Sequence, residues 1–309
     1  MNTKTRRLDA AQLTIPLTTP VLTAAQQAER PDRETRLAAA HAVLARGLAG
    51  VRDDPQALAA YLAFAARFHD YSPRNVLLVY LQRPTARFCA GFKTWMKHGR
   101  RVRAGERGLM IYAPIIRSAK KAEIQAGADA DERVVGYRTA TVFDLEQTVA
   151  FRDDALEYTP PVPRLEAEGP AGLLVRLEAA AEQIGCSVHY TALGYADGWF
   201  READRTIAVR ASLSDADRCS VLTHELAHAV AHSKGAPTGE AVLSAQDRAS
   251  KELQAEGAAY VALAALGLDT ERASLPYLKS WAGGDDRLLA ELSAIDRIAR
   301  RLLALVDAV

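Results

Sequence analysis

The strongest chemical signal in the sequence is the pentapeptide His224-Glu225-Leu226-Ala227-His228, which has the HExxH pattern. On a helix, positions i and i+4 lie one turn apart on the same face, so both imidazoles can reach one Zn²⁺ ion. The carboxylate of Glu225 would then lie beside the open coordination position, where it can take a proton from bound water. The motif therefore predicts a zinc site in which Glu225 is the catalytic acid/base.

A catalytic zinc site needs a third protein ligand. The metzincin pattern requires Gly and His at the positions that Ala231 and Lys234 occupy, so that pattern is absent. A later helical segment offers Glu252 and Glu256, again four residues apart, in a gluzincin-like arrangement. We assign Glu252 as the third ligand and Glu256 as the acceptor for a ring N–H of a ligand histidine. An ordinary solvated acidic helix face is the alternative for this pair.

Other residues near the motif carry weaker signals. His232 continues the same helical stripe, but two turns from His224 it would overreach one tetrahedral ion, so we expect a rim or surface position. Cys186 and Cys219 are expected to pack as small apolar side chains. Tyr195, Tyr260 and His232 are weak candidates for stabilising an oxyanion. The sequence contains no GxSxG, GxxxxGK[ST], GxGxxG or CxxC motif.

A second signal is the composition of residues 71–120, which contain eleven basic residues, one acidic residue and six interleaved aromatic residues. Cations along a groove, with flat rings on which bases stack, are what a binding site for single-stranded nucleic acid requires. The alternative is that the rings are core residues and the cations only a solvated face. We predict these DNA-binding residues: Arg74, Arg87, Lys93, Trp95, Lys97, Arg100, Arg101, Arg103 and Arg107.

The two signals lie in halves of opposite charge. Residues 1–150 carry 23 Lys/Arg and 14 Asp/Glu, a net charge of +9, whereas residues 151–309 carry 16 and 24, a net charge of −8. A chain of 309 residues is long enough for two domains. We therefore predict a flexible arm at 1–30, a DNA-binding domain at 31–155, a proline-rich linker at 156–170 and a metal-binding domain at 171–309.

Hydrophobic periodicity and turn residues predict an α+β fold, in which helices pack on a small antiparallel sheet and a mainly helical domain with a short mixed sheet follows. An acidic hairpin loop is expected at 118–133 and a turn at 101–108. The predicted helices span 33–49, 55–69, 72–81, 89–98, 171–184, 214–233, 245–266, 273–282 and 286–307. The predicted strands span 109–116, 134–143, 187–190, 198–201 and 205–210.

Composition also excludes several classes of protein. The longest apolar runs fall far short of the roughly 18 residues that cross a bilayer, so no membrane association is expected. Three cysteines without a CxxC pair indicate a reducing, intracellular setting. No apolar signal-peptide core follows the basic start, so we expect a cytoplasmic location and no secretion.

Two long strings resemble a known family. YSPRNVLLVYLQRPTARFCAGFKTWMKHGRRVRAGERGLMIYAPI and YRTATVFDLEQT resemble the N-terminal domain of ArdC-type antirestriction proteins of conjugative plasmids. The later strings GWF, RTIAVR, HELAH and ELQAEGAAYVAL are similar to the metallopeptidase domain of the same family, related to the ImmA/IrrE group. The resemblance covers about residues 30–285.

This resemblance implies binding of single-stranded DNA by the first domain and a site with ligands His224, His228 and Glu252. The expected function is antirestriction, in which the protein accompanies incoming single-stranded DNA during conjugation and protects it from host nucleases. Zn²⁺ or another divalent ion would serve peptide hydrolysis. Two alternatives stay open: a metal site that only braces a DNA-binding module, and a metalloprotease that cleaves a regulatory protein while DNA binding localises it.

Overall fold

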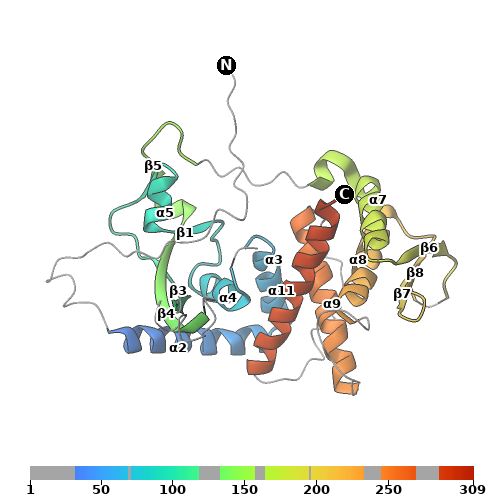
Figure 1. Cartoon of the computed structure of the whole chain (residues 1–309), viewed down its shortest axis with the longest axis horizontal. Helices are drawn as coiled ribbons and strands as arrows, with labels where there is room; N and C mark the ends of the chain where they lie inside the picture. The colour runs from blue at the N-terminus through green and yellow to red at the C-terminus, as the bar shows by residue number, and fades with distance from the viewer. Residues whose placement is uncertain are drawn as a thin grey trace, which may run out of the picture. The chain divides into compact units, whose positions relative to one another are not determined.

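The structure is a computed structural model that contains both helices and sheets (Figure 1). It describes residues 32–68, 71–117, 133–156, 164–194, 196–232, 245–268 and 285–309. The predicted arm at 1–30, nearly all of the predicted hairpin loop at 118–133 and the predicted helix at 273–282 lie outside these residues. Helices and small sheets occur in the proportions expected of the predicted α+β class, which is therefore confirmed.

The chain divides into two compact units, and each unit draws on two separate stretches of sequence. Of the described residues, the first unit holds 32–46 and 75–156, and the second holds 47–74 and everything from 164 onward. Residues 47–74 thus belong to the second unit, although the sequence-based prediction placed them in one continuous domain at 31–155.

The described residues between 32 and 98 form four helices, and local capping defines where some of them begin. They are α2 (Arg33–Asp53), α3 (Pro55–Ala65), α4 (Pro73–Gln82) and α5 (Phe92–Lys97). The side chain of Asp54 accepts a hydrogen bond from the Gln56 backbone N–H at 2.8 Å, which starts α3 directly after α2. The predicted helices at 33–49, 55–69 and 72–81 are therefore confirmed, with small differences at their ends.

The first unit contains two small antiparallel sheets among its described residues. One has the order β1 (Cys89–Gly91), β4 (Arg133–Asp144) and β3 (Leu109–Arg117), and its long β3–β4 hairpin confirms the predicted strand pair. The other pairs β2 (Arg100–Val102) with β5 (Thr148–Ala150).

Two local predictions in this region were correct only in part. The helix predicted at 89–98 begins only at Phe92, because Cys89–Gly91 pairs with β4 as strand β1. The predicted turn at 101–108 is present at 104–105, but Arg101 and Val102 belong to strand β2. Both strands are only three residues long and depend on partners about fifty residues away in the sequence, so local patterns do not reveal them.

The core of the first unit is organised around Trp95 and Asp144. Trp95 is 0% exposed, and its Nε1 donates a hydrogen bond to the Phe143 carbonyl at 2.9 Å. The buried carboxylate of Asp144 accepts from the backbone N–H groups of Arg87 and Phe88 at 2.9 and 3.2 Å. These bonds fix α5 and the segment before β1 against the end of β4.

The second unit combines a mixed sheet with long helices. Its described elements from residue 164 onward are α7 (Arg164–Gln183), β6 (Ser187–Thr191), β7 (Gly198–Arg201), β8 (Thr206–Arg210), α8 (Asp215–His232), α9 (Ala245–Leu266) and α11 (Asp285–Asp307). Strand β8 lies between β6, to which it is parallel, and β7, to which it is antiparallel. The predicted mixed sheet is therefore confirmed.

Part of the predicted linker is helical. Helix α7 already begins at Arg164 and is interrupted at Gly169, whose φ of 68° lies in the left-handed region that favours glycine. Pro170 follows and starts the second segment, because proline fits the first turn of a helix. The proline-rich composition of this stretch therefore marks a helix break as well as a connection.

The helices of the second unit pack closely around α9. It contacts α8 and α11, and α3 also packs against it although α3 lies far earlier in the sequence. A Cβ atom at Gly257 of α9 would lie 2.6 Å from Ile295 Cδ1 of α11, so glycine is what allows the close approach of these two helices. Among the described residues, no helix is both long and apolar enough to span a membrane.

Candidate metal centre and nucleic-acid surface

Helix α8 carries both histidines of the HExxH motif on one face. The helix begins where Ser214 and Asp217 form the expected cap, since the Asp217 N–H donates to Ser214 Oγ at 3.2 Å. Ten residues further on, His224 and His228 direct their Nε2 atoms to within 3.1 Å of each other. Two ring nitrogens this close, in rings inclined by 77°, converge on a common point above the helix.

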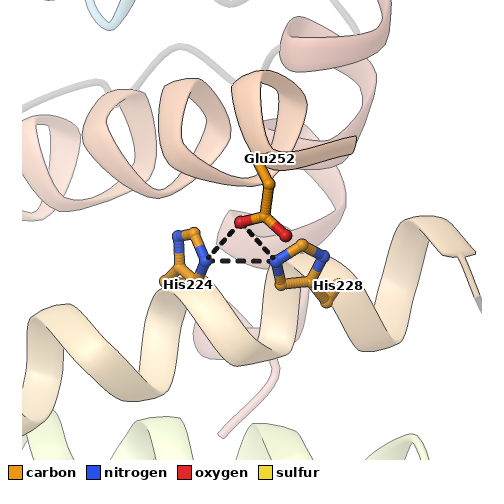
Figure 2. Close-up of side chains that lie close together, drawn as sticks. All are labelled: His224, His228 and Glu252. Carbon is orange, nitrogen blue, oxygen red and sulfur yellow. Dashed lines mark hydrogen bonds and ion pairs between the residues drawn. The ribbon is translucent and has the colours of Figure 1, made fainter. Parts of the chain in front are cut away.

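Helix α9 adds a carboxylate to the same point (Figure 2). Oε2 of Glu252 lies 3.6 Å from Nε2 of His224 and 3.5 Å from Nε2 of His228. Glu252, the earlier glutamate on α9, contacts His228, the later histidine on α8, and Glu256, the later glutamate, contacts His224, the earlier histidine. The two helices therefore run antiparallel, and their turns match at this point.

The three atoms fit a tetrahedral metal ion. In a tetrahedron with metal–ligand bonds of 2.0–2.2 Å, ligand atoms lie about 3.3–3.6 Å apart, and the three distances here are 3.1, 3.5 and 3.6 Å. Among the described residues, His224, His228 and Glu252 form the one group of three or more His, Cys, Asp or Glu side chains close enough together to hold a metal ion. Two imidazoles and a carboxylate are a donor set for a divalent metal ion.

Glu256 lies behind the first histidine, as the sequence predicts for a supporting carboxylate. Its Oε2 is 3.0 Å from Nδ1 of His224, a buried atom that makes no well-angled hydrogen bond to any described residue, so the two groups form an ion-pair contact. Burial opposes the charged form of His224, but its contacts with Glu252 and Glu256 outweigh burial and raise its pKa to about 10. The same histidine contacts lower the pKa of Glu252. A bound cation would take the place of the protons that these carboxylate and imidazole groups share.

Glu225 lies on the inner side of the site, where α8 passes strand β7. Its side chain is buried, with 8% of the residue exposed, and burial raises its pKa. A Cβ atom at Gly198 of β7 would lie 2.4 Å from Val221 Cγ1 and 3.4 Å from Glu225 Cγ. Glycine at this position therefore lets β7 run directly beside the motif helix. The sequence analysis did not single out Gly198, because only the tertiary packing shows that a side chain would not fit.

The remaining candidates of the second unit contribute less. Tyr260 is half-buried on α9, two turns beyond Glu252 on the side away from His228. Cys186 and Cys219 are buried, as expected for packed thiols. Tyr195 and the side chain of His232 lie outside the described residues.

In the first unit, helix α5 presents an apolar stripe beside a basic one. Phe92 and Met96 are one turn apart and are 43% and 40% exposed, and Lys93 and Lys97 follow them in the same one-turn spacing and are also exposed. Phe151, which is 42% exposed, lies beside the end of this helix because its N–H donates to the Gly99 carbonyl at 2.9 Å. Arg101 of the adjoining strand β2 is also exposed. We call these exposed residues together the α5 surface: Phe92, Lys93, Met96, Lys97, Arg101 and Phe151.

The other predicted DNA-binding cations differ in how they are engaged. Arg100 is half-buried and donates to Thr148 Oγ1 at 2.8 Å and to the Leu156 carbonyl at 3.0 Å, so it holds strand β5 in place. Arg103 makes two hydrogen bonds to Glu106 Oε1. Arg87 lies 3.8 Å from Glu146. Arg74 and Arg107 are exposed, and Arg74 belongs to the second unit.

The placement of Trp95 differs from its predicted role in DNA binding. A side chain that is 0% exposed and bonded to the Phe143 carbonyl has no face on which a base could stack. The physical reason is tertiary packing: Trp95 packs edge-on against Phe88 and bonds to Phe143, whereas Phe92 and Met96 on the same short helix stay exposed. Phe151 was missed because it lies outside the basic window that drew attention to this region.

Comparison with known proteins gives two successive family matches. Residues 48–143 match the model described as the N-terminal domain of anti-restriction factor ArdC. Residues 181–272, which include both histidines and both glutamates of the candidate metal centre, match the IrrE N-terminal-like domain. The order of the two matches confirms the resemblance that the sequence shows.

Individual relatives are distant. An uncharacterized protein of Bacillus anthracis is 28% identical over 262 residues, which cover 74% of this chain and 44% of the relative, so this chain spans less than half of that protein. Crystal structures of the antirestriction ArdC protein from plasmid R388, one metal-free and one bound to Mn(II), are 19% identical. Each alignment covers 77% of this chain and 83% of the chain in the crystal structure, with a TM-score of 0.49.

Proposed function

We propose, from the premise that this chain is an ArdC-type two-domain protein, that it is an antirestriction protein which binds single-stranded DNA. In this proposal the protein accompanies plasmid DNA during conjugation and protects it from nucleases in the bacterial cytoplasm. The observation that carries the proposal is the α5 surface, where exposed aromatic rings lie beside exposed cations.

The α5 surface suits a single strand better than a duplex. Phe92 offers an exposed ring on which an unpaired base can stack, and Phe151 offers a second one, over which the Arg152 guanidinium lies at 5.8 Å. The bases of a duplex, by contrast, are already stacked on one another. Lys93, Lys97 and Arg101 supply charge for the phosphates but no fixed pattern of donors for base edges. We therefore expect binding with little sequence preference and a strong dependence on salt.

The second unit supports a metallopeptidase activity. His224, His228 and Glu252 would hold Zn²⁺ or another divalent ion, with Mn²⁺ as the first alternative to test. When bound, such an ion supplies Lewis acidity to a peptide carbonyl and to water. Glu225 would take a proton from water and return it to the leaving amine. A metal that only braces the fold has no need of a buried carboxylate at this place.

One further function is favoured by a specific observation. Strand β7 pairs with β8 alone among the described strands, and it runs beside Glu225. A peptide could add to its other edge by main-chain hydrogen bonds, which is a general mode of peptide recognition. The second candidate function is therefore a metalloprotease that cleaves a regulatory protein, with DNA binding serving to localise it.

A conjugation assay with two variants separates these functions. We expect the triple variant Lys93→Ala, Lys97→Ala, Arg101→Ala to lose protection of the incoming plasmid, because it removes three exposed charges without touching the core. Glu225→Ala should keep most of the protection, since it retains all three proposed metal ligands. Lys251→Ala, a half-buried cation on α9, is the matched control for loss of a lysine. Loss of protection in Glu225→Ala, with fold and metal intact, would instead support proteolysis as the mechanism.

A further inference from the structure

A buried carboxylate on α11 lies behind the metal-binding helix. Glu291 is 6% exposed and accepts hydrogen bonds from two side chains of α9, from Ser250 Oγ at 2.7 Å and from Gln254 Nε2 at 2.6 Å. Arg287, one turn earlier on α11, donates to the same Ser250 Oγ at 2.8 Å. The matched family region ends at residue 272, so Glu291 lies beyond it.

The two partners of Glu291 flank the proposed ligand on its own helix. Ser250 and Gln254 lie two residues before and two residues after Glu252, and at about 100° per residue both project from the opposite side of α9. Helix α9 is therefore held from two sides: its acidic side faces the histidines of α8, and its amide and hydroxyl side is bound by α11.

Packing further along α9 does not fix its rotation to the same degree. At the next contact, Gly257 meets Ile295, and the interface there is apolar. Apolar contacts are not directional, whereas hydrogen bonds at 2.6 and 2.7 Å specify both distance and angle. Ser250 and Gln254, bonded to one carboxylate, define the rotation of α9 about its axis within the turn that carries Glu252.

We propose that Glu291 is a positioning residue for the metal centre, acting through Ser250 and Gln254 to direct Glu252 toward His224 and His228. A side chain about 5–6 Å from the helix axis moves by about 2 Å when the helix turns by 20°. Metal–ligand distances tolerate only about 0.2 Å, so even a small rotation separates the carboxylate from the histidines. This inference depends on the proposed metal site.

The test measures metal affinity in the full-length protein, using Zn²⁺ in competition with a chelator and the absorption of bound Co²⁺ as a report of coordination geometry. We expect Glu291→Leu, which keeps the volume but removes both acceptors, to raise the Kd for Zn²⁺ at least tenfold and to weaken the tetrahedral Co²⁺ bands. Glu291→Gln should stay within about threefold of wild type, because an amide can still bond to both partners. Effects of this size are known for residues that orient metal ligands.

Ile295→Ala is the matched control for stability, since it weakens the same helix pair through a cavity while leaving the polar contacts in place. At a comparable loss in Tm, it should leave the Kd and the Co²⁺ spectrum near wild type. If Glu291→Leu does not fold, Gln254→Leu removes one of the two anchors and should give a smaller change in the same direction.

Three outcomes would overturn the inference. One is wild-type affinity in Glu291→Leu or, if that variant does not fold, in Gln254→Leu. Another is an equal loss in Ile295→Ala and Glu291→Leu, which would show a purely structural role. The last is a wild-type protein that binds no metal, or binds it equally well after His224→Ala, and this outcome would remove the proposed metal site itself.

Discussion

The two candidate sites arrange their polar groups in opposite ways. At the metal centre, three side chains from two helices converge on one point, and a fourth side chain, the carboxylate of Glu256, supports one of them from behind. On the α5 surface, cations and rings point outward into solvent without a common target. A convergent site should fail when any one member is removed, whereas a divergent surface should weaken in steps. The predictions below test this difference.

The largest effect is expected at the metal centre. Replacing His224 or Glu252 by Ala removes one of three ligands, which we expect to cost about 4 kcal/mol of metal affinity, or roughly a thousandfold in Kd. Metal content after dialysis and Kd by chelator competition measure this. His189→Ala, an exposed histidine of β6, is the control and should bind as wild type. Full metal content in Glu252→Ala, together with loss of metal in Glu256→Ala, would show that the third ligand is Glu256, one helical turn further along α9.

The next effect separates the inward and outward aromatic residues of α5. We expect Trp95→Ala to lower the free energy of unfolding by about 3–5 kcal/mol, because it empties a fully buried site and leaves the Phe143 carbonyl without its partner. Chemical denaturation measures this change. Phe92→Ala should leave the stability within about 0.5 kcal/mol of wild type, as exposed positions usually do.

Phe92 should instead affect DNA affinity. Loss of one stacking ring is worth about 1–3 kcal/mol, so we expect Phe92→Ala to raise the Kd for a single-stranded oligonucleotide roughly tenfold or more. Fluorescence anisotropy at fixed salt is the measurement, and Phe92→Tyr, which keeps the ring, is the control. Equal binding by Phe92→Ala and wild type would place the strand on another surface.

The smallest effect is a change in salt dependence. Each phosphate contact contributes about −0.7 to the slope of log K against log salt for a single strand, so the triple variant at Lys93, Lys97 and Arg101 should flatten that slope by about 2. Arg103→Ala should change it by less, because this arginine already pairs with Glu106. Titrations at several salt concentrations measure both values, and an unchanged slope in the triple variant would exclude these cations as phosphate contacts.

The contrast between the convergent metal centre and the divergent α5 surface also explains which residues could be predicted from the sequence. Both pairs at the metal centre, His224 with His228 and Glu252 with Glu256, lie on long helices, where a spacing of four residues fixes a common face. Their faces meet because α8 and α9 pack directly against each other, and the structure brings together the residues that we expected to meet. The spacing of these residues alone does not show that the two helices pack together; this comes from the structure.

For the α5 surface, the sequence showed only that residues 71–120 are rich in basic and aromatic residues, and not which of them are exposed. Helix α5 has six residues, too few for its period to distinguish Trp95 from Phe92, and tertiary packing decided which ring turned inward. Phe151 joins the surface through strand β5, whose pairing with β2 no local pattern signals. The domain limits were equally hidden, since α3 lies in the matched ArdC region but packs on α9.

The packing of α3 on α9 has a consequence for the order in which the protein is made. From the end of α3 at residue 65 to the start of α9 at residue 245, the ribosome adds 180 residues. At about 5–20 residues per second, that takes roughly 10–40 s. For that time α3, whose Leu58, Leu62 and Phe64 are buried in the finished protein, has been synthesised while α9, against which it packs, does not yet exist. The nascent chain thus presents an apolar helix to chaperones long before its own partner for that helix is synthesised.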